Sequence, residues 1–410
     1  MKRFLFLPTI ILAILFGCSE VNENIDTNSG HYENSGNNAA NIISKLSPGI
    51  YTINVFGEIN PVTISNIKAA MINNPKAKIS LDLSETTGLT SIDEKAFKNC
   101  DGLVGISIPD SVTTIGKNAF DDCDSLISVT IPDNVTSIGN YAFGYCDKLK
   151  SVTIGKGVTS IDNKVFYWCN KLASIQIDEN NQTYSSYSNC IYNKDGTTLY
   201  LCAENATEVT ILGSTITICD NAFNDCDSLI SVTIPDNVTS IGKYAFGYCN
   251  KLTSVTIGKG VTSIGDNAFY WCSKLTSIQI DENNQTYSSN SNCIYNKDGT
   301  TLYLCPQTVT EVTILDSTIT ICDNAFNDCD SLTSVTIPAN VTTIGKYAFG
   351  NCNKLTNITF ADTTSTWYYT SRSDYTDGTA INVTDAATNA TNLTETYYNK
   401  YWYKEASSIE

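Results

Sequence analysis

Short runs in which apolar and small polar residues alternate dominate the middle of the chain. This pattern predicts β-strands that turn one face to a core and the other to solvent. In the run L-I-S-V-T-I, which begins at residue 126, we expect Leu126, Val129 and Ile131 to point inward. The hydroxyl residues Ser128 and Thr130 lie between them and should face the solvent.

The alternating run returns every 23 residues, within a unit that reads L-x-S-V-T-I-P-x-x-V-T-S-I-G-x-x-A-F-x-x-C-x-x. Proline ends the strand because it has no N–H to donate. The next valine and isoleucine return the chain across the core, and the Ala-Phe pair fills the far side. One coil cannot bury its apolar face alone, whereas stacked coils bury it between them. The leucines that open the units are Leu103, Leu126, Leu149, Leu172, Leu229, Leu252, Leu275, Leu332 and Leu355.

A longer period of 103 residues, which equals four units of 23 plus 11, overlies the short one. The extra residues fall in the coils that begin at Leu172 and Leu275, and both coils lack the Ala-Phe pair. Each contains N-C-I-Y-N-K-D-G-T-T-L-Y-L-C, at 189–202 and 292–305, which predicts a β-hairpin around a Gly-containing loop. We therefore predict a repeat solenoid of roughly a dozen coils, with one parallel β-sheet and two β-hairpin insertions.

The segment before the repeats has a different pattern. Residues 46–83 predict a strand at 51–56, a short amphipathic helix at 64–71 and a strand at 79–83. We interpret this segment as a small α/β N-terminal cap that shields the first coil.

The repeats occupy residues 84–360, and residues 361–410 are rich in Thr, Asn, Tyr and Trp. An open solenoid end exposes both the core and a strand edge, so we interpret 361–410 as a C-terminal cap. The alternative is a small aromatic binding module that uses Trp367, Tyr368, Tyr369 and Trp402.

The N-terminus resembles the signal peptide of a bacterial lipoprotein. Residues 1–17 carry two basic residues and then an apolar run that is too short to span a bilayer. The run ends in L-F-G-C, which resembles a lipobox with Cys18 as the lipid-modified residue; the alternative is an ordinary secretory leader. Several acyl chains on Cys18 would hold the protein at a membrane. We interpret residues 18–45, which are rich in Asn, Ser, Glu and Gly and include His31, as a flexible tether.

Composition argues against most enzymes and against nucleic-acid binding. The net charge is −17, which repels phosphate backbones. The single histidine is His31, and Arg372 is the one arginine beyond the leader. This excludes histidine-based triads, multi-histidine zinc sites and arginine clamps. We predict a protein that is not an enzyme and that uses no cofactor or metal.

Fifteen of the sixteen cysteines follow Cys18. Nine of them lie three residues after a repeat phenylalanine, where we expect buried free thiols that act as small hydrophobes rather than a disulfide ladder or a metal-thiolate tract. Whether Cys190 pairs with Cys202, and Cys293 with Cys305, stays open because the register of the hairpins is uncertain. The nine are Cys100, Cys123, Cys146, Cys169, Cys226, Cys249, Cys272, Cys329 and Cys352.

Aromatic residues follow the repeat phenylalanine in two pairs of adjacent coils. We expect them on the outer turn, at least partly exposed, as contacts for a ligand, because Trp and Tyr contribute strongly to interfaces. The alternative is that each pair packs under the hairpin of the following coil. The residues are Tyr145, Tyr167 and Trp168, and one long period later Tyr248, Tyr270 and Trp271.

The pattern I-P-x-x-V-T-x-I-G-x-x-A-F-x-x-C resembles the BspA-like, treponemal-type leucine-rich repeat family, from residue 79 to about 360. The chain departs from it at Val165, Cys219 and Cys322 and in the two hairpin coils. The resemblance implies a bacterial surface protein that adheres to host proteins or cells or mediates coaggregation. We expect a monomer that is lipid-anchored at the cell surface or outer membrane, binds surface proteins and binds no nucleic acid. A structural envelope spacer and a glycan-binding uptake component are the alternatives.

Overall fold

The computed structural model describes residues 11–15, 31–33 and 38–404. The chain divides into two compact units, Met1–Ala206 and Thr207–Glu410. Cys18 and most of the predicted leader and tether lie outside the described residues. Among the helices that are described, none is both long and apolar enough to cross a membrane.

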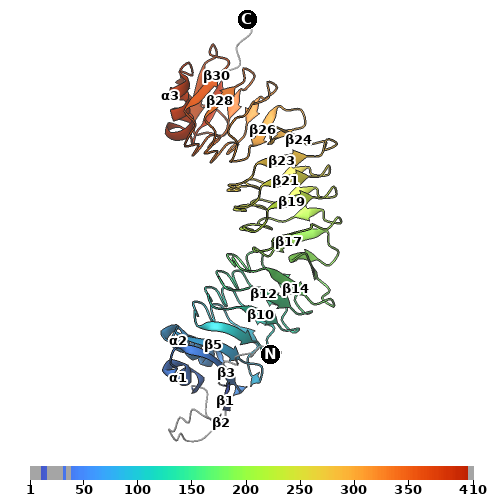
Figure 1. Cartoon of the computed structure of the whole chain (residues 1–410), viewed down its shortest axis with the longest axis vertical. Helices are drawn as coiled ribbons and strands as arrows, with labels where there is room; N and C mark the ends of the chain where they lie inside the picture. The colour runs from blue at the N-terminus through green and yellow to red at the C-terminus, as the bar shows by residue number, and fades with distance from the viewer. Residues whose placement is uncertain (1–10, 16–30, 34–37, 405–410) are drawn as a thin grey trace, which may run out of the picture. The chain divides into compact units, whose positions relative to one another are not determined.

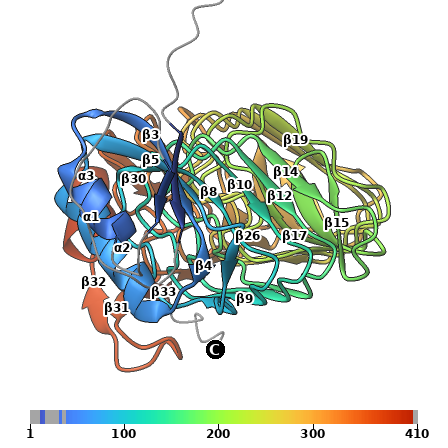
Figure 2. The same cartoon turned by 90° about the horizontal axis from the view of Figure 1, so that it is seen from below.

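The first unit begins with a parallel sheet in the order β2-β1-β3-β5-β8. Helices α1 (Asn38–Lys45) and α2 (Pro61–Asn73) lie together on one side of β3 and β5 (Figures 1 and 2). The predicted strand–helix–strand cap is confirmed as β3, α2 and β5, with element ends shifted by a few residues. The strands are β1 (Ile11–Leu15), β2 (His31–Glu33), β3 (Gly49–Val55), β5 (Ala77–Asp82) and β8 (Leu103–Ser107), with the short pair β4 (Gly57–Glu58) and β6 (Thr86–Thr87) beside them.

Helix α1 corrects the extent of the predicted tether. Residues 38–45 are helical, with Ala39 and Ile43 buried. The side-chain amide of Asn74 donates to the carbonyl of Ile43 at 2.8 Å and fastens the helix to the loop after α2. Strand β1 lies inside the predicted leader and pairs with β3, so removal of residues 1–17 would leave β3 at the edge of this sheet.

Three successive coils of the first unit, which begin at Leu126, Leu149 and Leu172, each contribute one four-residue strand to a parallel, in-register ladder. Val129 and Ile131 are buried, whereas Ser128 and Thr130 are exposed, as the alternation predicts. The ladder consists of β10 (Ser128–Ile131), β12 (Ser151–Ile154) and β14 (Ser174–Ile177).

A second ladder runs along the return side of the coils and is not foreseen from the sequence. Its strands have two residues each, and the core lies between the two ladders. A glycine follows two of these strands, β9 and β11, and packing requires it, because a Cβ on Gly139 would stand 2.7 Å from the backbone nitrogen of Lys117. The strands are β7 (Ser91–Ile92), β9 (Thr114–Ile115), β11 (Ser137–Ile138) and β13 (Ser160–Ile161).

The second unit repeats this arrangement. Its four-residue strands are β19 (Ser231–Ile234), β21 (Ser254–Ile257), β23 (Ser277–Ile280), β28 (Ser334–Ile337) and β30 (Asn357–Phe360). Its two-residue strands are β18 (Thr217–Ile218), β20 (Ser240–Ile241), β22 (Ser263–Ile264), β27 (Thr320–Ile321) and β29 (Thr343–Ile344). The structure therefore confirms the predicted leucine-rich repeat solenoid.

Each hairpin coil forms three antiparallel strands instead of the two that are predicted. The K-D-G loop turns at Gly196 and at Gly299, which have φ values of 69° and 71°. The strands are β15 (Tyr184–Tyr187), β16 (Cys190–Asn193) and β17 (Thr198–Cys202) in the first unit and β24 (Tyr287–Asn290), β25 (Cys293–Asn296) and β26 (Thr301–Leu304) in the second.

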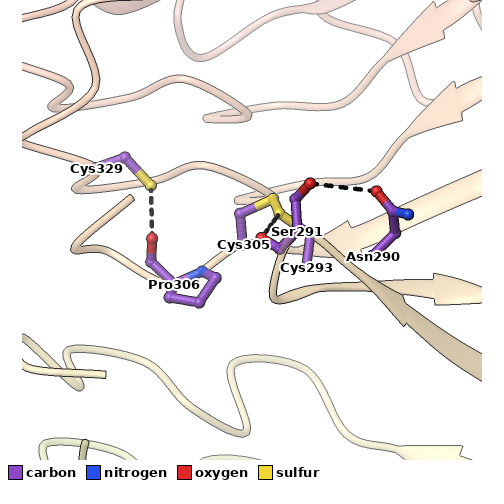
Figure 3. Close-up of a disulfide and its surroundings, with 6 residues drawn as sticks. All are labelled: Asn290, Ser291, Cys293, Cys305, Pro306 and Cys329. Atoms are coloured by element: carbon purple, nitrogen blue, oxygen red, sulfur yellow. Dashed lines mark hydrogen bonds between the residues drawn. A yellow bond between two sulfur atoms is a disulfide. The ribbon is translucent and has the colours of Figure 1, made fainter. Parts of the chain in front are cut away.

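The cysteines divide into two chemical groups. Cys190 of β16 and Cys202 of β17 form a disulfide, and so do Cys293 of β25 and Cys305, the residue after β26. Each bond joins the middle strand of its hairpin to the end of the last strand, and Figure 3 shows the second of the two. The nine repeat cysteines are free and buried, as predicted. Most of these thiols donate to a carbonyl of the preceding coil, as Cys146 does to Phe120 at 3.2 Å.

The repeat phenylalanines stack beside these thiols. In the first unit the ring centroids of Phe97 and Phe120 are 5.3 Å apart, and those of Phe120 and Phe143 are 5.0 Å apart. In the second unit, Phe223 and Phe246 stack at 4.7 Å. The far side of the core is therefore a column of rings flanked by a column of thiols.

The C-terminal residues cover the end of the last coil. Strand β33 (Tyr401–Lys404) pairs antiparallel with β29, and β31 (Trp367–Thr370) and β32 (Thr379–Ile381) extend that sheet. Helix α3 (Ala386–Thr391), which continues into the π-helical turn η1 (Asn392–Thr396), lies beside β30 (Figure 1). Trp367 and Trp402 are buried in the core, so neither ring is available as a surface contact for the alternative aromatic module.

Candidate functional site

The aromatic residues predicted as contacts in the first unit form one continuous cluster. Tyr145 lies 5.9 Å from Tyr167 and 5.6 Å from Trp168, measured between ring centroids. Tyr141 joins the cluster through an edge contact with Tyr167 at 5.6 Å. The exposed fractions of Tyr145 and Trp168 are 37% and 46%. We call Tyr141, Tyr145, Tyr167 and Trp168 the first aromatic cluster.

The backbone of the repeat turn sets the direction of these rings. Tyr141, Tyr145 and Trp168 have φ values of 52°, 55° and 60°, in the left-handed region that non-glycine residues seldom adopt. Adjacent coils hold the turn by backbone hydrogen bonds, such as that from the N–H of Tyr145 to the carbonyl of Tyr167 at 2.8 Å. While Phe143 between them points into the core, the tyrosines point out.

A cation completes the first cluster. The ammonium of Lys164 lies 5.9 Å from the centroid of Tyr141 and 5.8 Å from that of Tyr167. This distance permits a cation–π interaction. The sequence prediction missed Tyr141 and Lys164, although the spacing Y-A-F-G-Y places Tyr141 four residues before Tyr145, on the same outer turn.

The second unit carries the matching set, Tyr244, Tyr248, Tyr270 and Trp271, which we call the second aromatic cluster. Tyr248 lies 5.6 Å from Tyr270 and 6.0 Å from Trp271. The indole N–H of Trp271 donates to a carboxylate oxygen of Asp328 at 3.0 Å, and the ring is 46% exposed. Burial raises the pKa of Tyr248 and of Tyr270, so both phenols are neutral near pH 7.

The rings of Trp168 and Trp271 are each 46% exposed. In the first unit, the residues after β17 reach the backbone of Trp168, whose N–H donates to the Glu204 carboxylate at 2.8 Å. The ring itself keeps nearly half of its surface exposed. The structure therefore places Tyr145, Tyr167 and Trp168 together, and Tyr248, Tyr270 and Trp271 together, each set at the surface of its own unit.

The described residues offer little for catalysis or metal binding. Burial raises the pKa of Cys100 to about 12 and those of Cys123 and Cys249 well above the usual value, which keeps these thiols protonated and poor nucleophiles. Across the described part of the chain, no three His, Cys, Asp or Glu side chains gather in a way that could hold a metal ion.

Comparison with known proteins gives a family and a set of related folds. The family model described as BspA type leucine rich repeat region, in six copies, matches residues 79–194, 196–310 and 299–394. A leucine-rich repeat protein from Eubacterium ventriosum is 26% identical with a TM-score of 0.51, and the match covers 77% of this chain and 87% of that one.

Two further crystal structures are similar. A leucine-rich repeat protein from Bacteroides ovatus is 27% identical with a TM-score of 0.48, over 75% of this chain and 72% of that one. A leucine rich cell surface protein from Faecalibacterium prausnitzii is 24% identical with a TM-score of 0.48, over 78% and 81%. No curated protein matches the chain significantly.

Proposed function

Because the chain belongs to the BspA type leucine-rich repeat family, we propose that it is a lipid-anchored scaffold for protein–protein contact on the bacterial surface. Its role in this proposal is adhesion to host proteins or cells, or coaggregation with other bacteria. Leucine-rich repeat proteins present extended surfaces on a stacked core, and they generally act as binding scaffolds.

The observation that carries the proposal is the pair of exposed aromatic clusters. Trp and Tyr supply a large contact area at little cost in side-chain entropy, and they are enriched where binding energy concentrates. The rings are held in place before any partner binds, because Tyr145 and Trp168 contact each other and stand on a hydrogen-bonded turn. Two copies of one site in one chain would also raise avidity for a repetitive partner.

The location in this proposal rests on the first eighteen residues. The apolar run and the L-F-G-C sequence support export and lipid attachment at Cys18. The two hairpin disulfides agree with an oxidising environment outside the cytoplasm. A lipid on Cys18 would leave the coils free of the bilayer and available to partners.

Replacement of both exposed tryptophans tests the adhesive role. We expect the variant Trp168→Ala/Trp271→Ala of the full chain to bind an immobilised extracellular-matrix extract, or whole host cells, at least thirtyfold more weakly, because a hot-spot residue contributes about 2 kcal/mol. Each ring is about half buried, so each substitution should cost about 2–3 kcal/mol of folding stability, and binding is compared per folded molecule. Tyr187→Ala is the matched control, since Tyr187 is 45% exposed on a hairpin strand outside the clusters.

The same binding assay separates the alternatives. Saturable binding to a glycan array, with none to matrix proteins, would support an uptake component instead. Absence of saturable binding to matrix, cells and glycans would support a structural spacer. A fall in binding that only follows the folded fraction would assign the tryptophans to stability and not to contact.

A further inference from the structure

The turns that carry the phenylalanines form a hydrogen-bonded ladder of their own. In a regular coil of the second unit, three N–H groups at alternate positions donate to the next coil: Asn221 to Lys243 at 2.9 Å, Phe223 to Ala245 at 2.7 Å and Asp225 to Gly247 at 2.9 Å. The next coil repeats this through Tyr244, Phe246 and Tyr248, which donate to Asp266, Ala268 and Tyr270. We call this segment of each coil the arm.

The arm ladder stops at residues 267–271. The following coil is the hairpin coil, which lacks the Ala-Phe arm and so offers no carbonyls at these positions. Among the residues that the structure describes, none accepts a hydrogen bond from the N–H of Asn267, Phe269 or Trp271. In the first hairpin coil a carboxylate fills this role, because Glu204 accepts from the N–H of Trp168; residue 307, at the matching position, is glutamine.

The ladder of two-residue strands stops at the same place. Strand β26 pairs with β27 and not with β22. The N–H of Ile264 in β22 instead donates to the side-chain hydroxyl of Tyr287 at 3.3 Å. The second unit therefore contains a break in which one coil presents its backbone donors without a neighbouring coil to accept from them.

A cavity of about 580 Å³ lies at this break. Its lining includes the arm that contains Asn267 and Phe269 and the arm after β27, which contains Asp323 and Asn324. Tyr303, Cys305 and Pro306 also line the cavity, and Figure 3 shows the last two beside the disulfide. The volume falls in the range of about 300–1,000 Å³ that is typical of ligand pockets.

The cavity is acidic and aromatic. Asp266 and Asp323 line it together with Tyr303 and Tyr375, and no lysine or arginine is among the lining residues. Burial raises the pKa of Asp323, and the charge of Asp266 adds to this effect, although the N–H of Lys346 donates to Asp323. Asp266 has an ion pair with Lys243 at 3.0 Å that is open to solvent.

We propose that this groove binds an extended, basic peptide segment of a partner protein, which takes the place of the missing arm. The peptide carbonyls accept from the N–H groups of Asn267, Phe269 and Trp271, which stand at alternate positions along the arm as the donors of the regular arms do. A lysine or arginine of the peptide lies against Asp266 and Asp323, close enough to Tyr303 and Tyr375 for cation–π contact.

The charges select among possible occupants. Two carboxylates repel phosphates, sulfates and acidic peptides. A second copy of this chain has a net charge of −17 and is a poor partner for an acidic groove. The site uses backbone donors and carboxylates, whereas the aromatic clusters use exposed rings, so the proposal goes beyond the adhesive role and does not depend on it.

Fluorescence anisotropy with the full chain and a labelled peptide, acetyl-Val-Lys-Val-Lys-Val-amide, tests the proposal. We expect saturable binding that Asp266→Asn/Asp323→Asn weakens about tenfold, which corresponds to about 1.4 kcal/mol. The control Glu282→Gln/Asp298→Asn removes the same charge outside the groove and should bind like the parent. An analogue with ester links in place of two amides, whose carbonyls are weaker acceptors, should also bind less tightly. Melting curves of both variants confirm that they are folded.

Several outcomes would overturn the proposal: no saturable binding of the lysine peptide, equal weakening by the control variant, or equal affinity for the ester analogue. Binding of maltohexaose in place of the peptide would assign the groove to a sugar instead. The variant Trp168→Ala changes the first aromatic cluster and no residue of the groove, so it should bind the peptide like the parent and the matrix extract more weakly. A failure of the groove and a failure of the aromatic clusters are thus distinguishable.

Discussion

The disulfide of the second hairpin coil offers a stability test whose size follows from its position in the chain. Cys293 and Cys305 are 12 residues apart. In the chain-entropy treatment, closing a loop of that length lowers the entropy of the unfolded chain enough to stabilise the fold by about 2.8 kcal/mol at 25 °C. The partner sulfurs lie in a buried site, so Cys293→Ala/Cys305→Ala should lose close to that amount.

A local measurement suits a repeat protein, because long arrays do not always unfold in one step. Amide hydrogen exchange of residues 292–305 should accelerate about a hundredfold in the double variant, which is 2.8 kcal/mol at 1.4 kcal/mol per factor of ten. A thiol reductant should produce the same acceleration in the parent protein. Cys190→Ala/Cys202→Ala is the matched control and should affect residues 189–202 alone.

A thiol count provides an independent check of the same bonds. Two disulfides occupy four of the sixteen cysteines, so the denatured, unreduced chain should show 16 − 4 = 12 free thiols, or 11 if Cys18 carries lipid. A count of sixteen free thiols would refute the two disulfides. So would amide hydrogen exchange of residues 292–305 that does not change when a reductant is added. A count near one would instead mean that the repeat cysteines form a disulfide ladder.

Two further predictions concern the ends of the chain. Hydrogen bonds from Ser365, Lys404 and Thr364 hold the pKa of Asp362 far below its usual range. The stability that the ionised carboxylate contributes is therefore present near pH 7 and is lost as the pH falls through the folded-state pKa. Asp362→Asn should lower the free energy of urea unfolding by about 2 kcal/mol at pH 7, and this difference should shrink below about pH 4. Cys18→Ala should stay in the aqueous phase of a detergent partition, whereas the parent enters the detergent phase; equal partitioning would remove the case for a lipid anchor.

The regular part of the fold was predictable because the same 23-residue pattern recurs many times along the chain. Alternation placed Val129 and Ile131 in the core, and the constant spacing of Phe143 and Cys146 placed both on the far side, where the structure has them. The second ladder was missed for a physical reason. A two-residue strand such as Ser137–Ile138 is too short to show alternation, and only the neighbouring coils make it a strand.

The irregular parts were harder to predict because their structure depends on neighbours that the local sequence does not show. Helix α1 has only Ala39 and Ile43 to bury, and it is held by Asn74 from a distant loop. The aromatic residues after Phe143 were predicted from their spacing, but Tyr141 joins them through the left-handed backbone of the turn. No propensity scale indicates that geometry.

In the second unit, a hairpin replaces the Ala-Phe arm of one coil, and the cavity proposed to bind a peptide lies beside that hairpin. Where a coil keeps its Ala-Phe arm, every alternate N–H of the preceding arm has an acceptor, as Phe246 has in Ala268. Where the arm gives way to a hairpin, the coil carries instead the Cys293–Cys305 disulfide, which joins β25 to the residue after β26. The same replacement leaves the N–H groups of Asn267 and Phe269 facing a cavity. A uniform solenoid presents the same surface at every coil, so it distinguishes partners poorly along its length. The interruptions are therefore where specificity can arise, and variants placed there should alter binding more than variants of equal chemistry in the regular coils.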